Sequence, residues 1–305
     1  MGVEPVVRPV EFRGHAMLIA QLTDLHIGFD LDNPDELNFR RVASAIDYVK
    51  GLAVQPDRLF LTGDLTDHGD AASYRRLKSL IADCAFPVHL CVGNHDDRTV
   101  MKHVFPDLPI DDGFVQYVID EPEVRIIVLD TLDPGHHGGA FCPRRAGWLK
   151  ARLAEVPGKP VLLVLHHPPI ETGIPWMTAH PTEPWVVMLD KAIGDRAKVM
   201  MITGHIHRSI TTQWHGRMLS VAPSTAPQVA LEMAPMDPTT PDERPMIVAE
   251  APGVALHLWT GEFFVTHHAQ VGAPDVLARY DRNLQPLVQA LAEEHESVES
   301  GAAAA

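Results

Sequence analysis

The sequence predicts an α/β protein built on a mainly parallel β-sheet that helices cover on both faces. Three observations predict it. Short, continuous apolar runs alternate with segments of helical periodicity, which is typical of parallel strands buried on both faces. A polar cluster follows most of these runs. The chain has 305 residues, of which 46% are hydrophobic and 21% are charged, so it can form one large domain, or one domain with a small appendage.

The first third of the chain supplies three predicted strands and two predicted helices. The apolar runs at 17–22, 58–62 and 88–92 are predicted strands. Residues 37–52 and 71–84 are predicted helices. The helical periodicity of the first helix rests on apolar residues that fall on one face, namely Phe39, Val42, Ala43, Ile46 and Val49.

The rest of the chain continues the same alternation. Strands are predicted at 124–129, 161–165 and 199–203, and a helix at 143–153. Two further strands, at 254–259 and 262–267, flank Thr260-Gly261 and predict a β-hairpin.

Several stretches depart from the alternation. An insertion that begins at residue 171 and ends at about 190 is expected to lie over the strand ends. Residues 235–245 are rich in proline and predict a surface loop. Residues 275–296 predict a weak amphipathic helix that Pro286 interrupts, and 301–305 are expected to fray. We therefore expect a main domain at 1–270 and a helical tail at 271–305.

Composition limits the partners of this chain. The 25 Lys and Arg residues face 40 Asp and Glu residues, giving a net charge of −15, which argues against nucleic-acid polymers and anionic membranes. An acidic protein can still bind a phosphate if divalent cations reverse the local field. No apolar run is long enough to span a bilayer.

Targeting signals and cysteine usage point to the same compartment. The N-terminus has no signal-peptide pattern, and Val6 does not fit a myristoylation pattern. Cys84, Cys91 and Cys142 show neither metal spacing nor a disulfide framework. Cytoplasm is the expected location.

Five polar clusters follow predicted strands, and they are the main functional signal. Because ligands bind beyond the carboxyl ends of parallel strands, we expect the five to meet in one site. They are Asp24-Leu25-His26, Gly63-Asp64-Leu65-Thr66-Asp67, Gly93-Asn94-His95-Asp96, His166-His167-Pro168-Pro169 and Gly204-His205-Ile206-His207.

These residue types suit a pair of metal ions. Zinc, manganese and iron accept imidazole nitrogen and carboxylate oxygen. Asp24 and His26 are two residues apart, so an extended segment can direct both side chains to one side, and the second pair, His205 and His207, has the same spacing. Asp64 has two oxygens and is able to bridge two ions. Asn94 adds a neutral oxygen, and His166 completes the set.

The five motifs, in order and spacing, resemble those of the calcineurin-like metallophosphoesterases over residues 18–224. The length and layout resemble the bacterial class III cyclic nucleotide phosphodiesterases and related glycerophosphodiesterases. The resemblance implies a four-layer β-sandwich flanked by helices, with a small insertion over the active site and a C-terminal hairpin.

The resemblance also implies roles for individual residues. Asp24, His26 and His207 would bind the first metal; Asn94, His166 and His205 would bind the second, and Asp64 would bridge. His95 would contact the substrate phosphate and assist the leaving oxygen, while Asp67 would orient His95. In the His166-His167 pair the family's ligand is the first histidine, although the sequence leaves an exchange with His167 open.

The implied activity is hydrolysis of small phosphodiesters, such as 3',5'-cAMP or glycerophosphodiesters, by a hydroxide that bridges two divalent ions of iron, manganese, zinc or cobalt. Protein phosphatases of the family usually carry Arg at the position of His68, which argues against a phosphoprotein substrate. His68 is a candidate substrate contact, and a solvated residue at a helix start is the other interpretation.

Three alternatives stay open at this stage. The site suits a phosphomonoesterase or a nucleotide-lipid pyrophosphatase, for which only Trp176, Met177 and Trp185 hint at an apolar entrance, and their packing against the core is the simpler interpretation. A non-catalytic interaction protein is disfavoured because every expected ligand is present. Assembly into a homo-oligomer through the C-terminal hairpin is a further expectation.

Overall fold

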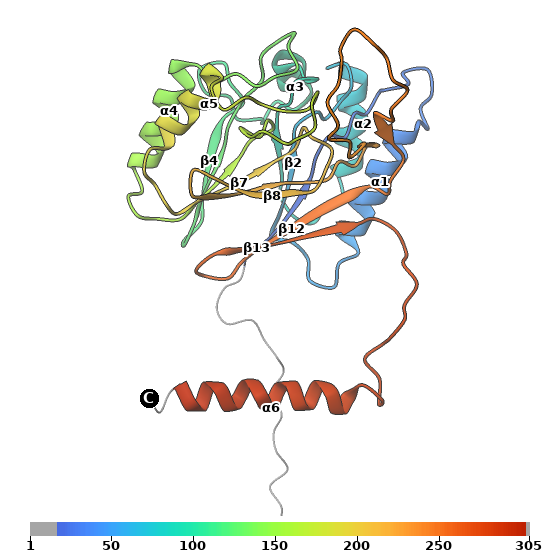
Figure 1. The fold of residues 1–305 in the computed structure, drawn as a ribbon, viewed down its shortest axis with the longest axis vertical. Helices are drawn as coiled ribbons and strands as arrows, with labels where there is room; N and C mark the ends of the chain where they lie inside the picture. The colour runs from blue at the N-terminus through green and yellow to red at the C-terminus, as the bar shows by residue number, and fades with distance from the viewer. Residues whose placement is uncertain (1–16, 303–305) are drawn as a thin grey trace, which may run out of the picture. The chain divides into compact units, whose positions relative to one another are not determined.

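The computed structural model describes residues 17–302 and shows a mixed α/β fold (Figure 1). The helices are α1 (Leu37–Lys50), α2 (Ala71–Ile81), α3 (Arg98–Val104), α4 (Pro143–Ala154), α5 (Pro184–Ile193) and α6 (Gln285–Ala302). The strands are β1 (Met17–Leu22), β2 (Arg58–Thr62), β3 (Val88–Cys91), β4 (Tyr117–Asp120), β5 (Arg125–Val128), β6 (Val161–Val164), β7 (Val199–Thr203), β8 (Ile210–Trp214), β9 (Arg217–Val221), β10 (Gln228–Val229), β11 (Ile247–Val248), β12 (Gly253–Trp259) and β13 (Phe264–Gln270).

The strands form two larger sheets. One has the order β13-β12-β1-β2-β3 and the other the order β4-β5-β6-β7-β9-β8. The central pairings, β1 with β2, β2 with β3, and β5 through β6 and β7 to β9, are parallel, whereas the outer pairings are antiparallel. The expectation of one mainly parallel sheet is therefore wrong, because antiparallel edge strands complete two separate sheets.

Two clusters of buried apolar side chains hold these layers together. The first joins β1 and β2 to α1 and α2, and it also takes in Ile126 and Val164 from the second sheet. The second packs α4 and α5 against the second sheet. Figure 1 shows α4 and α5 on one side of the strands and α1 and α2 on the other. Continuous apolar strands are stable here because each is covered on both faces.

The strands and helices predicted between residues 17 and 270 are confirmed, including the hairpin of β12 and β13. Besides α5, six elements were not predicted, namely α3, β4, β8, β9, β10 and β11. The segment 171–190, predicted as an insertion, consists of a loop at 171–183 and the first part of α5, which begins at Pro184. Trp185 on α5 is buried in the second core, so it packs rather than forming an entrance.

The chain separates into two compact units, one whose described part is 17–271 and one whose described part is 272–302. The second unit contains α6, which begins at Gln285. Pro286 therefore lies at the second helical position, where a missing N–H does no harm, and does not interrupt the helix as expected. The expected fraying at 303–305 lies outside the described residues. In the described part of the chain, no helix has the length and apolarity that a membrane crossing requires.

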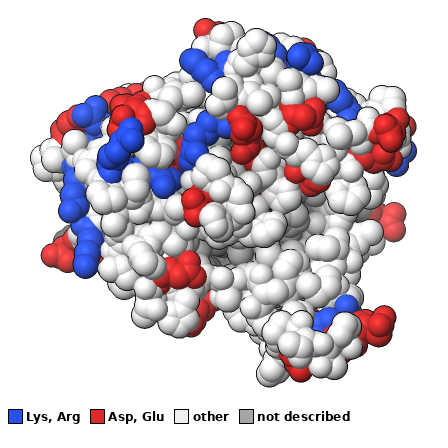
Figure 2. Space-filling view, turned by 90° about the horizontal axis from the view of Figure 1, so that it is seen from above, with Lys and Arg blue, Asp and Glu red and all other residues white. Residues whose placement is uncertain are grey.

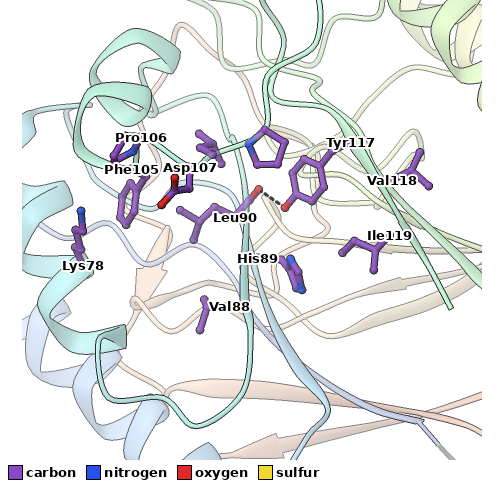
Figure 3. Close-up of a pocket in the computed structure, with 12 residues that line it drawn as sticks. Lys78, Val88, His89, Leu90, Phe105, Pro106, Asp107, Tyr117, Val118 and Ile119 are labelled. Atoms are coloured by element: carbon purple, nitrogen blue, oxygen red, sulfur yellow. Dashed lines mark hydrogen bonds between the residues drawn. The ribbon is translucent and has the colours of Figure 1, made fainter.

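A hollow of about 500 Å³ lies beside β3 and β4, away from the predicted site (Figure 3). Lys78, Phe105 and Ile119 are among the residues that line it. Two of the other lining residues are joined directly, since the hydroxyl of Tyr117 donates to the carbonyl of Leu90 at 2.9 Å. None of the predicted site residues lines this hollow, so it is not the candidate site.

A buried polar chain links the two sheets. The Nε2 of His257 donates to Gln21 Oε1 at 2.9 Å, and its Nδ1 accepts from the Thr266 hydroxyl at 2.8 Å. The amide of Gln21 then donates to the hydroxyl of Thr62 and to the carbonyl of Thr203, at 2.8 and 2.9 Å. Burial, with a smaller contribution from the charge of His268, lowers the pKa of His257 to about 3.

We expect His257 to make the folded state acid-sensitive. Below an unfolded pKa of about 6.5, the unfolded chain binds a proton that the folded chain rejects until its pKa of about 3. Stability therefore falls as the pH drops through this window, by at most about 1.4 kcal/mol per pH unit from this residue. Urea unfolding between pH 4 and 7 measures the slope, which should flatten in His257→Gln and stay unchanged in the exposed His267→Gln. An unchanged slope in His257→Gln would contradict the assignment.

Candidate metal centre

The five polar clusters meet at the carboxyl ends of strands from both sheets. Asp24, Asp64 and Asn94 follow β1, β2 and β3 of the five-stranded sheet, while His166 and His205 follow β6 and β7 of the six-stranded sheet. Because neighbouring parallel strands end at one edge, residues far apart in the sequence become neighbours there.

The first group of side chains surrounds one point. The Nε2 atoms of His26 and His207 are 3.2 Å apart, and His207 Nε2 lies 3.5 Å from Asp24 Oδ1. Two nitrogens bound at about 2.1 Å to one tetrahedral ion lie roughly 3.4 Å apart. The spacing in this group is therefore that of ligands to a single ion.

The second group lies beside the first and shares Asp64 with it. Asp64 Oδ2 is 3.6 Å from His26 Nε2 and 3.3 Å from His166 Nε2. The Oδ1 atom of Asn94 and the Nε2 atom of His166 are buried without a hydrogen-bond partner. Buried polar atoms without partners are rare and call for an explanation. A cation at this position would satisfy both, so the residues fit the metal that their chemistry implies.

Outward hydrogen bonds orient two of the histidines. His166 Nδ1 donates to the carbonyl of Thr62 at 2.8 Å, and His207 Nδ1 donates to the carbonyl of Pro227 at 2.9 Å. The Nε2 atom of each ring therefore faces the centre, and it offers a lone pair there once a metal ion displaces its proton. This is the usual way in which a protein fixes the tautomer of a metal-binding histidine.

The same reasoning separates His166 from His167, which the sequence could not do. The Nε2 of His167 donates to the carbonyl of His137 at 3.2 Å, and its Nδ1 accepts from the hydroxyl of Thr131 at 2.8 Å. Both ring nitrogens of His167 are therefore engaged outside the centre, whereas the Nε2 of His166 faces Asp64 Oδ2 at 3.3 Å. We keep His166 as the proposed ligand.

Asp67 contacts a different histidine from the one expected. Its Oδ1 accepts from His26 Nδ1 at 2.8 Å, but lies 3.8 Å from His95 Nδ1. His95 Nδ1 instead donates to the backbone carbonyl of Asp67 at 2.8 Å. The expected orientation of His95 thus comes from the main chain, and the carboxylate orients His26. Burial would raise the pKa of Asp67, but its bond to His26 outweighs this and lowers it.

His68 does not reach the centre. Its side chain is half exposed, with Nε2 3.4 Å from Asp67 Oδ2. It lines neither of the two cavities that open onto the centre. The expected substrate contact of His68 therefore has no support in this arrangement, and the interpretation as a solvated residue is favoured.

The carboxylates and imidazoles of the centre stabilise one another's charged forms. Burial would raise the pKa of Asp24 and of Asp64, but the facing imidazoles of His207 and His166 outweigh it and lower both. Burial would lower the pKa of His166, yet the charge of Asp64 raises it to about 9. For His205, burial prevails and lowers the pKa to about 3. The carboxylates thus stay charged, and divalent cations could replace the protons that now balance them.

Backbone conformation sets these residues apart. The φ angles of five expected ligands lie in the left-handed region, which side chains other than glycine rarely adopt. They are Asp24 at 53°, His26 at 46°, Asp64 at 48°, His205 at 71° and His207 at 53°. Only three other described residues besides glycine do the same. Strain of this kind concentrates at functional sites, where the surrounding structure enforces it.

Gly93 of the third motif is required because a larger residue would collide with Asp64. A Cβ at Gly93 would lie 2.2 Å from Asp64 Oδ1 and 2.3 Å from the Asp64 backbone nitrogen. The loop after β3 can therefore approach the loop after β2 only with glycine at this position. This contact brings Asn94 beside Asp64.

Sequence reasoning assigned no role to Asp96, which joins the same two loops. Its buried carboxylate accepts from the backbone N–H groups of Gly93 at 2.9 Å and Leu65 at 3.2 Å, and from the Tyr74 hydroxyl at 2.8 Å. Burial, aided by the charge of Asp64, raises the pKa of Asp96 to about 7. Its place at the end of the Gly93–Asp96 motif was the available signal.

A cavity of about 390 Å³ opens onto the centre. The loop before α5 contributes Trp176 and Met177 to its wall, so this part of the predicted insertion does lie over the site. His137 also lines the cavity, and its ring centroid lies 6.0 Å from that of His95. The cavity therefore offers the centre, His95 and an apolar wall to one ligand.

The sequence is similar to those of known phosphoesterases. Residues 17–209 match the family described as calcineurin-like phosphoesterase. The chain is 30% identical to a probable glycerophosphodiester phosphodiesterase GpdQ of Arcobacter nitrofigilis, over 83% of this chain and 92% of that protein. It is 34% identical to a probable cyclic nucleotide phosphodiesterase of Rhodopseudomonas palustris, over 70% of this chain and 82% of the relative.

A solved structure shares the fold. GAP50, described as the anchor in the inner membrane complex of Plasmodium, superposes with a TM-score of 0.56 at 14% identity, covering 86% of this chain and 87% of that one. At this identity the likeness concerns the fold alone.

Proposed function

Because the chain belongs to the calcineurin-like phosphoesterase family, we propose that it is a metal-dependent hydrolase of small phosphodiesters, either cyclic nucleotides such as 3',5'-cAMP or glycerophosphodiesters. The observation that carries the proposal is the position of Asp64, whose Oδ2 lies within 3.6 Å of His26 Nε2 and 3.3 Å of His166 Nε2. One carboxylate oxygen thus stands between two groups of ligands, as a centre for two ions requires.

The ligand residues fall into two sets. Asp24, His26 and His207 would bind one ion. Asn94, His166 and His205 would bind the other, with Asp64 between the two. Two divalent ions, when bound, supply Lewis acidity toward the phosphoryl oxygens and lower the pKa of a water molecule that attacks phosphorus. Iron, manganese, zinc and cobalt all suit the nitrogen and oxygen donors of this set.

His95 would handle the proton of the leaving group. Its Nδ1–H is held by the backbone carbonyl of Asp67, so its Nε2 side is available to the cavity. When protonated, this nitrogen can donate to a phosphoryl oxygen and then pass the proton to the leaving oxygen. The Asp67 carboxylate, through His26, would hold the first ligand set in place.

Charge favours a diester over a monoester. A diester carries one negative charge at neutral pH, whereas a monoester carries up to two. Among the described residues that line the cavity, none is Lys or Arg. Figure 2 shows Lys and Arg interspersed with Asp and Glu over the face it views, without a continuous basic surface. The cytoplasmic location and a homo-oligomeric state stay predictions.

The test is turnover of bis(p-nitrophenyl) phosphate beside p-nitrophenyl phosphate, on protein stripped of metal and refilled with manganese. We expect diester turnover to exceed monoester turnover by at least roughly tenfold, because of the charge argument above, and to vanish in the stripped protein. Preference for the monoester would indicate a phosphomonoesterase. Inactivity on both, with two ions bound, would favour a nucleotide-lipid pyrophosphatase or a non-catalytic protein.

A further inference from the structure

A second cavity, of about 540 Å³, adjoins the first on the side of the first ligand set. The two cavities share His26, His207 and Ile247. The centre is therefore open on two sides, and a ligand bound there has room to extend in two directions.

The second cavity has an exposed apolar wall. Phe29 is 70% exposed, Leu37 49% and Ile247 53%, and all three line it. Large apolar side chains grouped at a cavity mouth, rather than scattered singly, mark a binding surface. An aromatic ring exposed to water in this position gains nothing from burial, so contact with a ligand is the reason we consider for it.

The segment that carries Phe29 is held firmly. The carboxylate of Glu36, which is 2% exposed, accepts from the backbone N–H of Gly28 and from that of Asp30 at 2.8 Å. Arg76 neutralises this carboxylate, with Nη1 3.1 Å from Glu36 Oε1. One buried group thus fixes the main chain on both sides of Phe29, so the exposed ring is presented from a rigid loop.

The polar groups around this wall argue against a second anionic group in the ligand. Asp30, Glu36 and Asp67 line the cavity, and Arg40 is its only lysine or arginine among the described lining residues. Arg40 is paired with Asp35 at 3.5 Å. A neutral arm therefore suits this cavity better than one that carries another phosphate.

We propose that this second cavity is a subsite for the arm of the diester that stays on phosphorus, and that it selects a neutral, flat arm such as an aryl group or a nucleobase, which stacks on Phe29. The proposal rests on the function proposed above. His95 lines only the first cavity of the two, so the leaving group belongs there and the retained arm is directed to the other side.

The chemistry of the step is unchanged by this assignment. Water oxygen forms a bond to phosphorus, the bond from phosphorus to the leaving oxygen breaks, and a proton passes to that oxygen. From an acyclic diester the products are an alcohol or phenol from the first cavity and a monoester whose arm lies in the second. From a cyclic diester the leaving oxygen stays on the retained arm, so the only product is one ring-opened monoester. Phe29 takes no part in bond making and acts only through binding of the retained arm.

Two substrates with the same leaving group test the subsite. Bis(p-nitrophenyl) phosphate keeps an aryl arm after cleavage, whereas methyl p-nitrophenyl phosphate keeps a methyl arm. We expect Phe29→Ala to lower kcat/KM for the aryl substrate roughly tenfold, the size of one stacking contact, and to change that for the methyl substrate less than about twofold. Intrinsic reactivity cancels because each substrate is compared with itself across variants.

Two further variants sharpen the comparison. Phe29→Trp keeps a flat apolar surface and should restore the preference for the aryl substrate. Phe263→Ala removes a comparably exposed ring, 56% exposed between β12 and β13, and should leave both substrates unchanged. Metal content, measured in every variant, should stay equal to that of the original protein.

The outcomes separate the two proposals. Equal loss on both substrates, or no loss on either, would overturn the subsite while leaving the proposed phosphodiesterase intact. Failure of the fully metal-loaded original protein to hydrolyse either diester would overturn the proposed function, and the subsite with it.

Discussion

The His95→Ala variant is expected to keep both metal ions and to lose about 10²- to 10⁴-fold in kcat, the range typical of a general acid. The side chain lines the cavity and is held by the carbonyl of Asp67. The backbone N–H of His95 donates to Asp64 Oδ1 at 2.9 Å. That bond survives the substitution to alanine, so the ligand sets should remain intact.

The size of the loss should depend on the leaving group. A good leaving group such as p-nitrophenolate needs little protonation, whereas an alkoxide needs a full proton. We therefore expect a larger loss on an alkyl or nucleoside diester than on bis(p-nitrophenyl) phosphate. A merely structural role would lower both equally.

A matched control and the metal content complete this test. His136→Ala alters an exposed histidine of the neighbouring loop, which is paired with Asp133 at 3.2 Å, and should leave turnover unchanged. His95 also falls within ligand distance of His26 and Asp64. Loss of an ion from His95→Ala would make it a ligand and contradict its assigned role.

The Asp64→Ala variant is expected to lose at least one of the two metal ions and essentially all diester turnover. Its carboxylate lies between His26 and His166, so both ligand sets lose a donor and a negative charge at once. Removing even an outer partner of a ligand typically weakens metal affinity about 10- to 100-fold, and a shared ligand should matter more.

Elemental analysis after dialysis measures this loss directly. Asp64→Asn keeps the shape and the acceptor for the His95 N–H but removes the charge, so it should retain more metal than Asp64→Ala. The exposed Asp195→Ala should behave like the original protein. A fully loaded Asp64→Ala, with unfolding temperatures showing that it is folded, would refute the bridging position.

Local patterns predicted the elements that lie deepest in the fold. Strands such as β1 and β6 are continuous apolar runs, and they are buried as such runs must be. The missed elements lack that signal. The seven-residue helix α3 is too short to show helical periodicity. In β4, apolar and polar residues do not alternate regularly, and the end of the strand is exposed.

The sequence by itself determined the family, the α/β class and the residues of the candidate centre, because these depend on residue type and order along the chain. Only the tertiary structure decided which atoms face the centre. Thr131 and His137 form hydrogen bonds with the two ring nitrogens of His167. The carboxylate of Asp67 accepts a hydrogen bond from His26 rather than from His95. These contacts join segments about 30 to 40 residues apart, and strand spacing sets their geometry.

The second cavity likewise could not be predicted from the sequence. In the sequence, Phe29 is one aromatic residue in a polar loop, with nothing to distinguish it from a buried one. Its proposed role depends on Glu36, which fixes the loop, and on Ile247, more than 200 residues away, which lines the same cavity. Chain order determines which groups are available for chemistry, but the packing of distant segments determines the shape of the space that a substrate must fill.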